Sequence, residues 1–354
     1  GYRYPHAYAE HWVAQQYLPS AMQGQVFWQP GSLGWEGSRR TQLQQRRAAQ
    51  LAAAVEQESE LGELLSSGPD DPSLERWLQR QLGSEGERLD QLRSRLWQDA
   101  RWRRHDRVLI LEARSLLWAL DPLQHTPEGG VVIEVTDPSD AERIQAQLRV
   151  LDSLRQPRIV EGTLLTLSDA IEPGEQFEWI AGRQALSHGS AEQLEHNIEM
   201  LQRLAAPSAQ LRLMFSQPML GPAAALLATD ALDPSLRQCL EPLQAAETSW
   251  LNRSAERAAL ERALQKRGWQ LVWQQWQEPL QLSLSEGLIE RWMGPQASYR
   301  RLLTDRLTPP QLQQLAEQLK ALVGLQLPQQ LEHQLLRAQR SGRSANTMKK
   351  PAPA

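Results

Sequence analysis

The sequence predicts an α/β fold organised around a seven-stranded, mostly parallel sheet, with helical extensions at both ends. The first observation is a pair of short apolar runs, 108–111 and 131–135, of the kind that forms buried strands. The second is the helix-length segment between them, closed by a Pro-Glu-Gly-Gly turn. Strand, helix and strand over about thirty residues is the pattern of a parallel βαβ unit. The third is that the same alternation continues along the chain.

The next elements follow in order. A helix is expected at Ser139–Leu154, because Ile144, Leu148 and Leu151 recur on one face. Later elements are a third strand at Pro157–Gly162, a fourth around Phe177–Ala181, a helix with Ser190 as its N-cap, and a fifth strand at Leu211–Met219.

The end of the sheet is predicted from Ala223 onwards. A long helical stretch, Ala223–Lys266, precedes two apolar runs, Trp269–Gln277 and Leu280–Leu288. The short turn between them, Glu278-Pro279, predicts an antiparallel hairpin at the edge of the sheet.

Helical segments are also predicted on either side of this α/β core. They are Ser38–Ser66, Leu74–Leu82 and Glu87–Arg104 before it, and Tyr299–Leu307, Gln311–Val323 and Pro328–Gln339 after it. The small, polar, Pro-rich end of the chain predicts a disordered tail. The predicted divisions are an irregular segment 1–37, a helical linker 38–88, an α/β domain 89–294, C-terminal helices 295–340 and a tail 341–354.

Composition excludes several classes of protein. The 354 residues carry a formal net charge of -4, which argues against a dedicated nucleic-acid-coating protein. Cys239 is the single cysteine, so a disulfide framework and a multi-cysteine zinc site are excluded, and a reducing, cytoplasmic compartment is expected. No run approaches the roughly eighteen apolar residues of a membrane span, so no membrane is expected as a partner. Because the chain does not begin with Met, we expect it to be cut out of a longer protein.

The first 37 residues are dense in aromatics, Pro and Gly, with no lasting periodicity. They read YPHAY, then HWVAQQYLP, then FWQPGSLGWEG, and this order resembles the closing stretch of the bacterial RarA (MgsA) replication-associated recombination ATPases. The residues that match in order are Tyr4, Pro5, His6, Tyr8, Trp12, Val13, Gln15, Gln16, Tyr17, Leu18 and Pro19. Ala7 departs from the usual Asp, and the match covers about a tenth of the chain.

The resemblance implies an AAA+ ATPase upstream of Gly1, followed by a helical oligomerisation domain of which this segment is the tail. It implies a homo-oligomer formed through that part, DNA or replication proteins as further partners, and ATP bound only in the upstream part. This chain itself has no G-x-x-x-x-G-K-[ST] loop, so it cannot hold a nucleotide in the P-loop manner. His6 and His11 are interpreted as packing or surface residues, with no metal site.

The strand-helix order resembles the class I S-adenosylmethionine-dependent methyltransferases, which have a Rossmann-like fold. The resemblance covers about 89–294, and its pieces are Arg107–Leu111 as the first strand, Pro127–Gly130 before the second, Phe177–Arg183 as the fourth and Ser216–Pro218 at the end of the fifth. It implies S-adenosylmethionine as the candidate cofactor. The residues at the corresponding places are Glu112, Ala113, Ser115, Glu134, Asp137, Gly162 and Thr163.

Residue by residue, the fit to that cofactor is poor. Ile110 stands where an Asp is usual, and Arg114 takes the place of the first glycine of a turn that must leave room for the ligand. Thr163 replaces the common Asp after the third strand, and the fifth strand has no Asn-Pro-Pro-Tyr motif. The sequence therefore favours a lost site, hence a non-catalytic accessory domain, over an active but divergent methyltransferase.

A third hypothesis concerns the basic segment Arg93–Arg107. Its arginines alternate with Trp97 and Trp102, a pattern that can bind a nucleic-acid backbone. The alternative is a solvated helix face with the Trp rings on the core side. Two sequence neighbours, His105 with Asp106 and Ser187 with His188, are interpreted as surface polar residues, and no catalytic residue is expected.

Overall fold

The computed structural model describes residues 39, 43, 46–49, 52, 88–149, 156–187, 190–230, 232, 234–295 and 297–340. The segment 1–37, the predicted helix Leu74–Leu82 and the tail 341–354 lie outside the described residues. Of the predicted helix Ser38–Ser66, the described residues are helical, and Ala48, Ala49 and Ala52 are buried.

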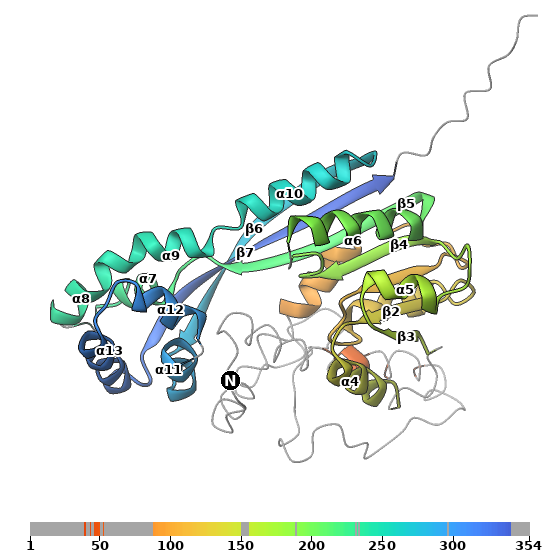
Figure 1. The fold of residues 1–354 in the computed structure, drawn as a ribbon. Coiled ribbons are helices and arrows are strands. Elements are labelled where there is room, and N and C mark those ends of the chain that lie inside the picture. The colour runs from red at the N-terminus through yellow and green to blue at the C-terminus, as the bar shows by residue number, and fades with distance from the viewer. Residues whose placement is uncertain are drawn as a thin grey trace, which may run out of the picture.

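The described residues form one seven-stranded sheet of order β3-β2-β1-β4-β5-β7-β6, in which β1 to β5 are parallel and β7 is antiparallel to both of its neighbours. The strands are β1 Val108–Leu111, β2 Val131–Val135, β3 Arg158–Glu161, β4 Phe177–Arg183, β5 Ala205–Pro218, β6 Trp269–Ser283 and β7 Gln326–Arg340. Figure 1 shows this sheet with helices packed on it. The predicted Rossmann-like, mostly parallel α/β fold is confirmed.

The inner strands β1 and β2 are buried along their whole length, and all of their residues except Glu134 are apolar, because both of their faces are covered. Alternate residues enter separate cores: Ile110 joins one side with helix 88–97, η4 Leu117–Ala119, α3 Leu120–His125 and α4 Pro138–Arg149. Leu109 joins the other with α5 Leu164–Ala170, α6 Ala191–Leu204 and α10 Ser254–Gln265. Helices between consecutive strands thus cover both faces, as parallel connections require.

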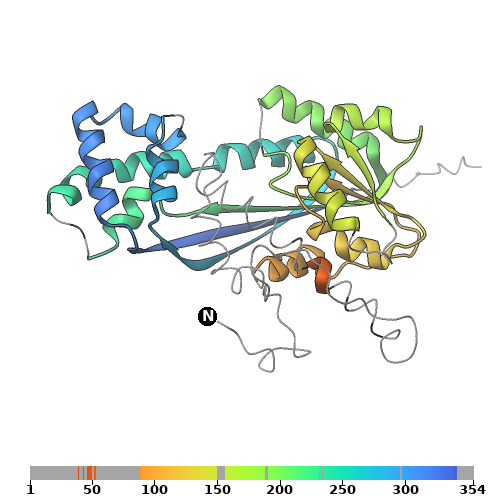
Figure 2. The ribbon, with the colours of Figure 1, turned by 90° about the horizontal axis from the view of Figure 1, so that it is seen from below.

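Three strands, β5, β7 and β6, run well beyond the short parallel ones and form a long ribbon (Figures 1 and 2). A second group of helices, here called the helical lobe, surrounds the far end of this ribbon around its own core. Its members are α7 Pro222–Leu227, α8 Pro234–Leu240, η5 Glu241–Leu243, α9 Gln244–Leu251, α11 Glu286–Met293, α12 Ser298–Thr304 and α13 Pro309–Ala321. The chain enters the lobe between β5 and β6 and again between β6 and β7.

The predicted closing hairpin is wrong in its connection. Glu278 and Pro279 lie inside the continuous strand β6, and the partner of β6 is β7, which the sequence had predicted as the helix Pro328–Gln339. Leu327, Leu331 and Leu335 recur at a spacing of four, which satisfies the period of a helix and that of a strand alike. Pro279 is tolerated because β6 is an edge strand, where a missing N–H removes no sheet hydrogen bond. The sheet therefore extends to Arg340, and α11 to α13 are inserted into it.

Two predicted helices are shorter in the structure than the sequence indicated. The helix predicted at Glu87–Arg104 is helical over 88–97 and ends in a turn, so Arg101 and Arg103 lie in a loop. The helical stretch Ala223–Lys266 is broken into α7, α8, η5, α9 and α10. The N-cap of α6 is confirmed: Ser190 Oγ accepts from Gln193 N at 3.2 Å. In the described part of the chain, no helix is long and apolar enough to cross a membrane.

Candidate cofactor site

The carboxyl ends of β1, β2 and β4 are where an open parallel sheet of this kind holds a ligand. We call this the carboxyl edge. Glu112 follows β1, Glu134 lies near the end of β2, and the turn 184–187 follows β4. The fold brings these three segments together, as parallel strands must.

Glu134 and Asp137 are the two candidates for an acid that would hold the ribose of the cofactor, and the Glu134 carboxylate is used inside the protein. Its side chain is buried, with 1% of the residue exposed. Oε2 accepts from Glu112 N at 2.6 Å, and Thr136 Oγ1 donates to Oε1 at 3.5 Å. The pKa of Glu134 is raised to about 7, chiefly by burial and also by the Glu112 carboxylate, while the hydrogen bonds oppose the rise. A diol would therefore meet a buried carboxyl group that already holds the Glu112 N–H.

Glu112 connects the turn after β1 to the turn after β4. Its backbone is left-handed, with φ 46°, and its Oε1 accepts from Leu186 N at 2.9 Å. Leu186 and Gln184 are also left-handed, with φ 61° and 54°. Non-glycine residues in this region cost on the order of 1 kcal/mol each, so the surrounding contacts must hold these turns in place. The two turns are fastened to each other rather than opened towards a ligand.

Gln184 ties the same turn to β5. Its Nε2 donates to Ser216 O at 2.9 Å, and its Oε1 accepts from Ser216 N at 3.2 Å. Its own backbone N donates to Met214 O at 2.8 Å. The carboxyl ends of β4 and β5 are thus closed by one amide side chain.

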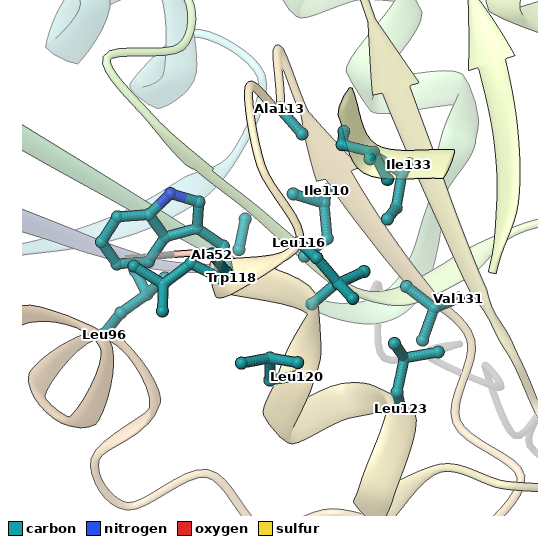
Figure 3. Packing of buried hydrophobic residues seen from close by; sticks show 14 of the residues in the cluster. Ala52, Leu96, Ile110, Ala113, Leu116, Trp118, Leu120, Leu123, Val131 and Ile133 are labelled. Atoms are coloured by element: carbon teal, nitrogen blue, oxygen red, sulfur yellow. The ribbon is translucent and has the colours of Figure 1, made fainter. Parts of the chain in front are cut away.

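Ala113 and Ser115 point into the core instead of lining a pocket. Ser115 is fully buried, and its Oγ accepts from Leu117 N at 3.2 Å. The following N–H, of Leu116, donates to Gln147 Oε1 at 2.9 Å. Figure 3 shows Ala113, Leu116, Trp118 and Ile110 gathered in one apolar cluster. The segment in which a glycine turn would leave room for a cofactor therefore packs inward.

Arg114, the residue at the place of the first glycine, acts on the acids of the next turn. Asp137 is exposed, and its pKa is lowered first by the hydrogen bond from Ser139 N, at 2.9 Å, and more weakly by the charges of Arg143 and Arg114. Asp137 thus caps the start of α4 through its carboxylate. Asp140 also experiences the Arg114 charge, although burial is the larger effect and raises its pKa. The Arg114 charge therefore acts on both carboxylates, but it is the main cause of neither shift.

Gly162 and Thr163 serve the start of α5. Gly162 has φ 137°, and a Cβ there would lie 2.3 Å from Thr166 Oγ1. Gly162 N donates to Val135 O at 2.8 Å, and Thr163 N donates to Thr166 Oγ1 at 2.9 Å. The glycine allows close packing of the protein on itself, and Thr163 is the exposed N-cap.

Of the seven predicted residues, Glu112 and Ala113 both contact Glu134: Glu112 N donates to the Glu134 carboxylate, and Ala113 N donates to Glu134 O at 2.9 Å. The Glu112 carboxylate in turn accepts from Leu186 N. The site as built does not fit S-adenosylmethionine. Sequence reasoning missed Gln147 and Leu186. The role of Gln147 could have been inferred from the sequence, because it is a polar residue beside Ile144 and Leu148 on the apolar face of α4. The role of Leu186 could not, because it contributes only a backbone N–H.

Comparison with known proteins supports the resemblance of the first segment. Residues 1–47 match the family described as MgsA AAA+ ATPase C terminal, which confirms the resemblance of the first segment and extends it by ten residues beyond 37. Nearly all of that match lies outside the described residues. The chain matches no curated protein in sequence.

Solved structures with a similar arrangement include several methyltransferases. The YcgJ protein of Bacillus subtilis is 16% identical with a TM-score of 0.41, over 71% of this chain and 97% of that one. A geranyl diphosphate methyltransferase, solved with GPP and sinefungin, is 12% identical with a TM-score of 0.40, over 84% and 99%. The cyclopropane synthase MmaA2 of Mycobacterium tuberculosis is 12% identical with a TM-score of 0.38, over 73% and 84%. These scores are low, so the fold class rests on the strand order itself.

Proposed function

We propose that the described α/β domain is a non-catalytic, methyltransferase-like accessory module of a RarA-like AAA+ ATPase that acts in DNA replication or recombination. The observation that carries the loss of catalysis is the buried Glu134 carboxylate, which accepts the Glu112 N–H at 2.6 Å. A cofactor's ribose would have to compete with that bond for a carboxylate that is already buried. Leaving the Glu112 N–H without an acceptor would cost about 1–3 kcal/mol, which weakens any ligand that requires it.

The link to the ATPase rests on residues 1–47 and their match to the MgsA C-terminal family. On this proposal the homo-oligomer forms through the RarA-type part, DNA or replication proteins are the partners, and ATP binds only upstream. The α/β domain would then act as a binding module and would catalyse no reaction of its own.

The test is calorimetric titration of the whole chain with S-adenosylmethionine and with its demethylated product. We expect no saturable heat up to about 1 mM ligand, which corresponds to a binding free energy weaker than about -4 kcal/mol. A methyltransferase of known cofactor affinity, titrated in the same buffer, shows that the ligand is intact. Micromolar binding overturns the proposal.

The second candidate, an active but divergent methyltransferase, is favoured by one specific observation. Acidic residues remain at the ends of both β1 and β2, as Glu112 and Glu134. If titration finds binding, Glu134→Ala should abolish it and Asp137→Ala should weaken it, since these acids would then hold the ribose hydroxyls. A circular-dichroism melt of each variant separates loss of binding from loss of fold.

A further inference from the structure

The opposite edge of the sheet carries a surface with a different character. Helix 88–97 ends in a loop that enters β1 at Val108, so the loop lies at the amino ends of the parallel strands. Five exposed basic side chains occur within seven residues of this loop, here called the basic turn: Arg101, Arg103, Arg104, His105 and Arg107. The cofactor residues described above lie at the other edge.

The backbone of the basic turn is held rigidly. Asp106 is buried, and its Oδ2 accepts from Arg103 N and from Trp179 Nε1, both at 2.9 Å. Arg104 O accepts from Glu128 N at 2.9 Å and from Gly129 N at 3.1 Å. The basic side chains therefore project from a fixed scaffold, which reduces the entropy lost on binding.

Most of these cations have no carboxylate of their own. Among the described residues, no acidic side chain lies within ion-pair distance of the Arg101, Arg103 or Arg107 guanidinium. Arg104 pairs with Glu128 at 2.7 Å, but both side chains are largely exposed, and such a pair contributes little. The Glu178 carboxylate next to the turn already accepts from Arg107 N at 2.7 Å. The turn thus presents positive charge to solvent although the chain as a whole is acidic.

Two aromatic rings stand beside these cations. Trp102 is half-buried against Trp97 and Trp179, with ring centroids 4.9 and 4.8 Å away. The exposed His125 ring also lies parallel to the Trp102 ring, with an interplanar angle of 5° and a centroid separation of 6.1 Å. A parallel, partly exposed pair of rings is a platform on which a base can stack.

The structure also corrects which arginines can take part. Arg93, on helix 88–97, pairs with Asp90 at 2.8 Å and Asp121 at 3.2 Å. The Arg95 guanidinium lies over the Trp276 ring, 4.3 Å from its centroid. Arg93 is therefore neutralised by two carboxylates and Arg95, although exposed, lies against an aromatic ring, whereas the arginines of the basic turn project into solvent.

We propose that the basic turn and the Trp102–His125 pair bind single-stranded nucleic acid. The arginines contact phosphates, and a base stacks on the exposed His125 ring. A single strand is favoured over a duplex because paired bases cannot reach a ring on the protein surface. An acidic peptide would use the charges but would leave the rings without a role. This goes beyond the proposed function because it holds whether or not the carboxyl edge binds a cofactor.

The experiment measures fluorescence anisotropy of a labelled oligothymidine of about 16 nucleotides with the whole chain at several salt concentrations. With about three phosphate contacts, a plot of log affinity against log salt should have a slope of about -2, from roughly -0.7 per contact. The variant Arg101→Ala/Arg103→Ala/Arg107→Ala should bind at least about tenfold more weakly at low salt, with a flatter slope. A matched control, Arg301→Ala/Arg306→Ala/Lys320→Ala, removes the same charge from the helical lobe and should bind as wild type.

The stacking part has its own pair of variants. His125→Ala should weaken binding by about fivefold or more without changing the salt slope, whereas His105→Ala, exposed but outside the ring pair, should not. Equal binding by the two triple variants overturns the site. Equal effects of the two His variants, or equal affinity for a duplex of the same sequence, overturn the single-strand assignment. Preferential binding of a glutamate-rich peptide at the turn would identify an acidic protein partner instead.

Discussion

At both edges of the parallel sheet, the carboxyl edge and the edge formed by the amino ends of the strands (the amino edge), a buried carboxylate holds a turn by accepting a backbone N–H. The two turns differ in the side chains that they leave facing solvent. At the carboxyl edge, buried Glu134 accepts the N–H of Glu112; at the amino edge, buried Asp106 accepts the N–H of Arg103. After Glu112, the side chains of Ala113 and Ser115 go inward, and the turn becomes part of the core. Around Asp106, the guanidinium groups go outward.

The comparison teaches that an acidic residue at the end of a strand can serve the fold itself. The buried Glu134 carboxylate accepts the Glu112 N–H and so holds the turn after β1. Conversely, a surface at the edge where the fold is not expected to bind anything can keep its charges unpaired. Each edge can be altered without touching the other, because β1 separates them.

The largest expected effect comes from Gly129→Ala at the amino edge. A Cβ on Gly129 would lie 1.9 Å from Asp106 O, a backbone atom that cannot rotate away. We expect the free energy of unfolding to fall by about 3 kcal/mol, the upper end for overpacking, measured by urea denaturation. The control is Gly174→Ala, where φ is 83° but no atom lies within 4 Å, and a loss of only about 1 kcal/mol is expected. Equal losses would mean that the basic turn does not depend on this close approach.

The second effect is the pH dependence contributed by Glu134. Its pKa is raised in the folded protein, to about 7, so the stability it contributes is fully present below its unfolded pKa and is lost as pH rises through about 7. The shift corresponds to a loss on the order of 3 kcal/mol between about pH 4.5 and pH 8. Urea denaturation at intervals of pH should show this fall in the wild type and a smaller one in Glu134→Gln, which does not titrate.

The contribution of Glu134 must be taken as the difference between the wild-type and Glu134→Gln curves, because other buried acids also titrate. Burial also raises the pKa of Glu247 and Asp121, so the wild-type curve alone cannot be assigned to one group. Asp137, at the same edge but exposed and with a lowered pKa, is the matched control: Asp137→Asn should leave the slope above pH 5 unchanged. If Glu134→Gln follows the wild type throughout, the carboxyl edge is not held by a buried carboxyl group.

The sequence predicted the parallel part of the fold well, and for a physical reason. The runs 108–111 and 131–135 are apolar at every position except Glu134. Both strands are buried along their whole length, as strands covered on both faces are, and both formed where expected. The failure at β7 has an equally physical cause. Leu327, Leu331 and Leu335 suit both periods, and only pairing with β5, more than a hundred residues earlier, decides between them. Glu278-Pro279 resembled a turn because proline is rare inside strands, but an edge strand such as β6 tolerates a proline that an inner strand does not.

The candidate site was predictable as a set of positions but not as a set of contacts. Arg114 at a glycine position was a readable sign that the pocket had changed. That Glu112 would become left-handed and bind Leu186 N was not readable, because a backbone N–H belongs to every residue type except proline. At the amino edge, the mixture of Arg and Trp was visible, but only the end of the helix at 97 showed which arginines are exposed.

The smallest expected effect on stability is that of Arg104→Ala, in the basic turn at the amino ends of the parallel strands. It tests whether an exposed arginine stabilises this turn or only adds charge to its surface. Arg104 Nε is 2.7 Å from Glu128 Oε1, with 72% and 54% of the two side chains exposed. Because water screens such a pair, Arg104→Ala should change the free energy of unfolding by less than about 0.5 kcal/mol, measured by urea denaturation. Asp106→Asn is the contrasting variant, since its buried oxygen accepts from two donors, and it should cost more. A loss above about 1 kcal/mol for Arg104→Ala would mean that the exposed arginines support the turn, and a structural role would then account for their charge without a ligand.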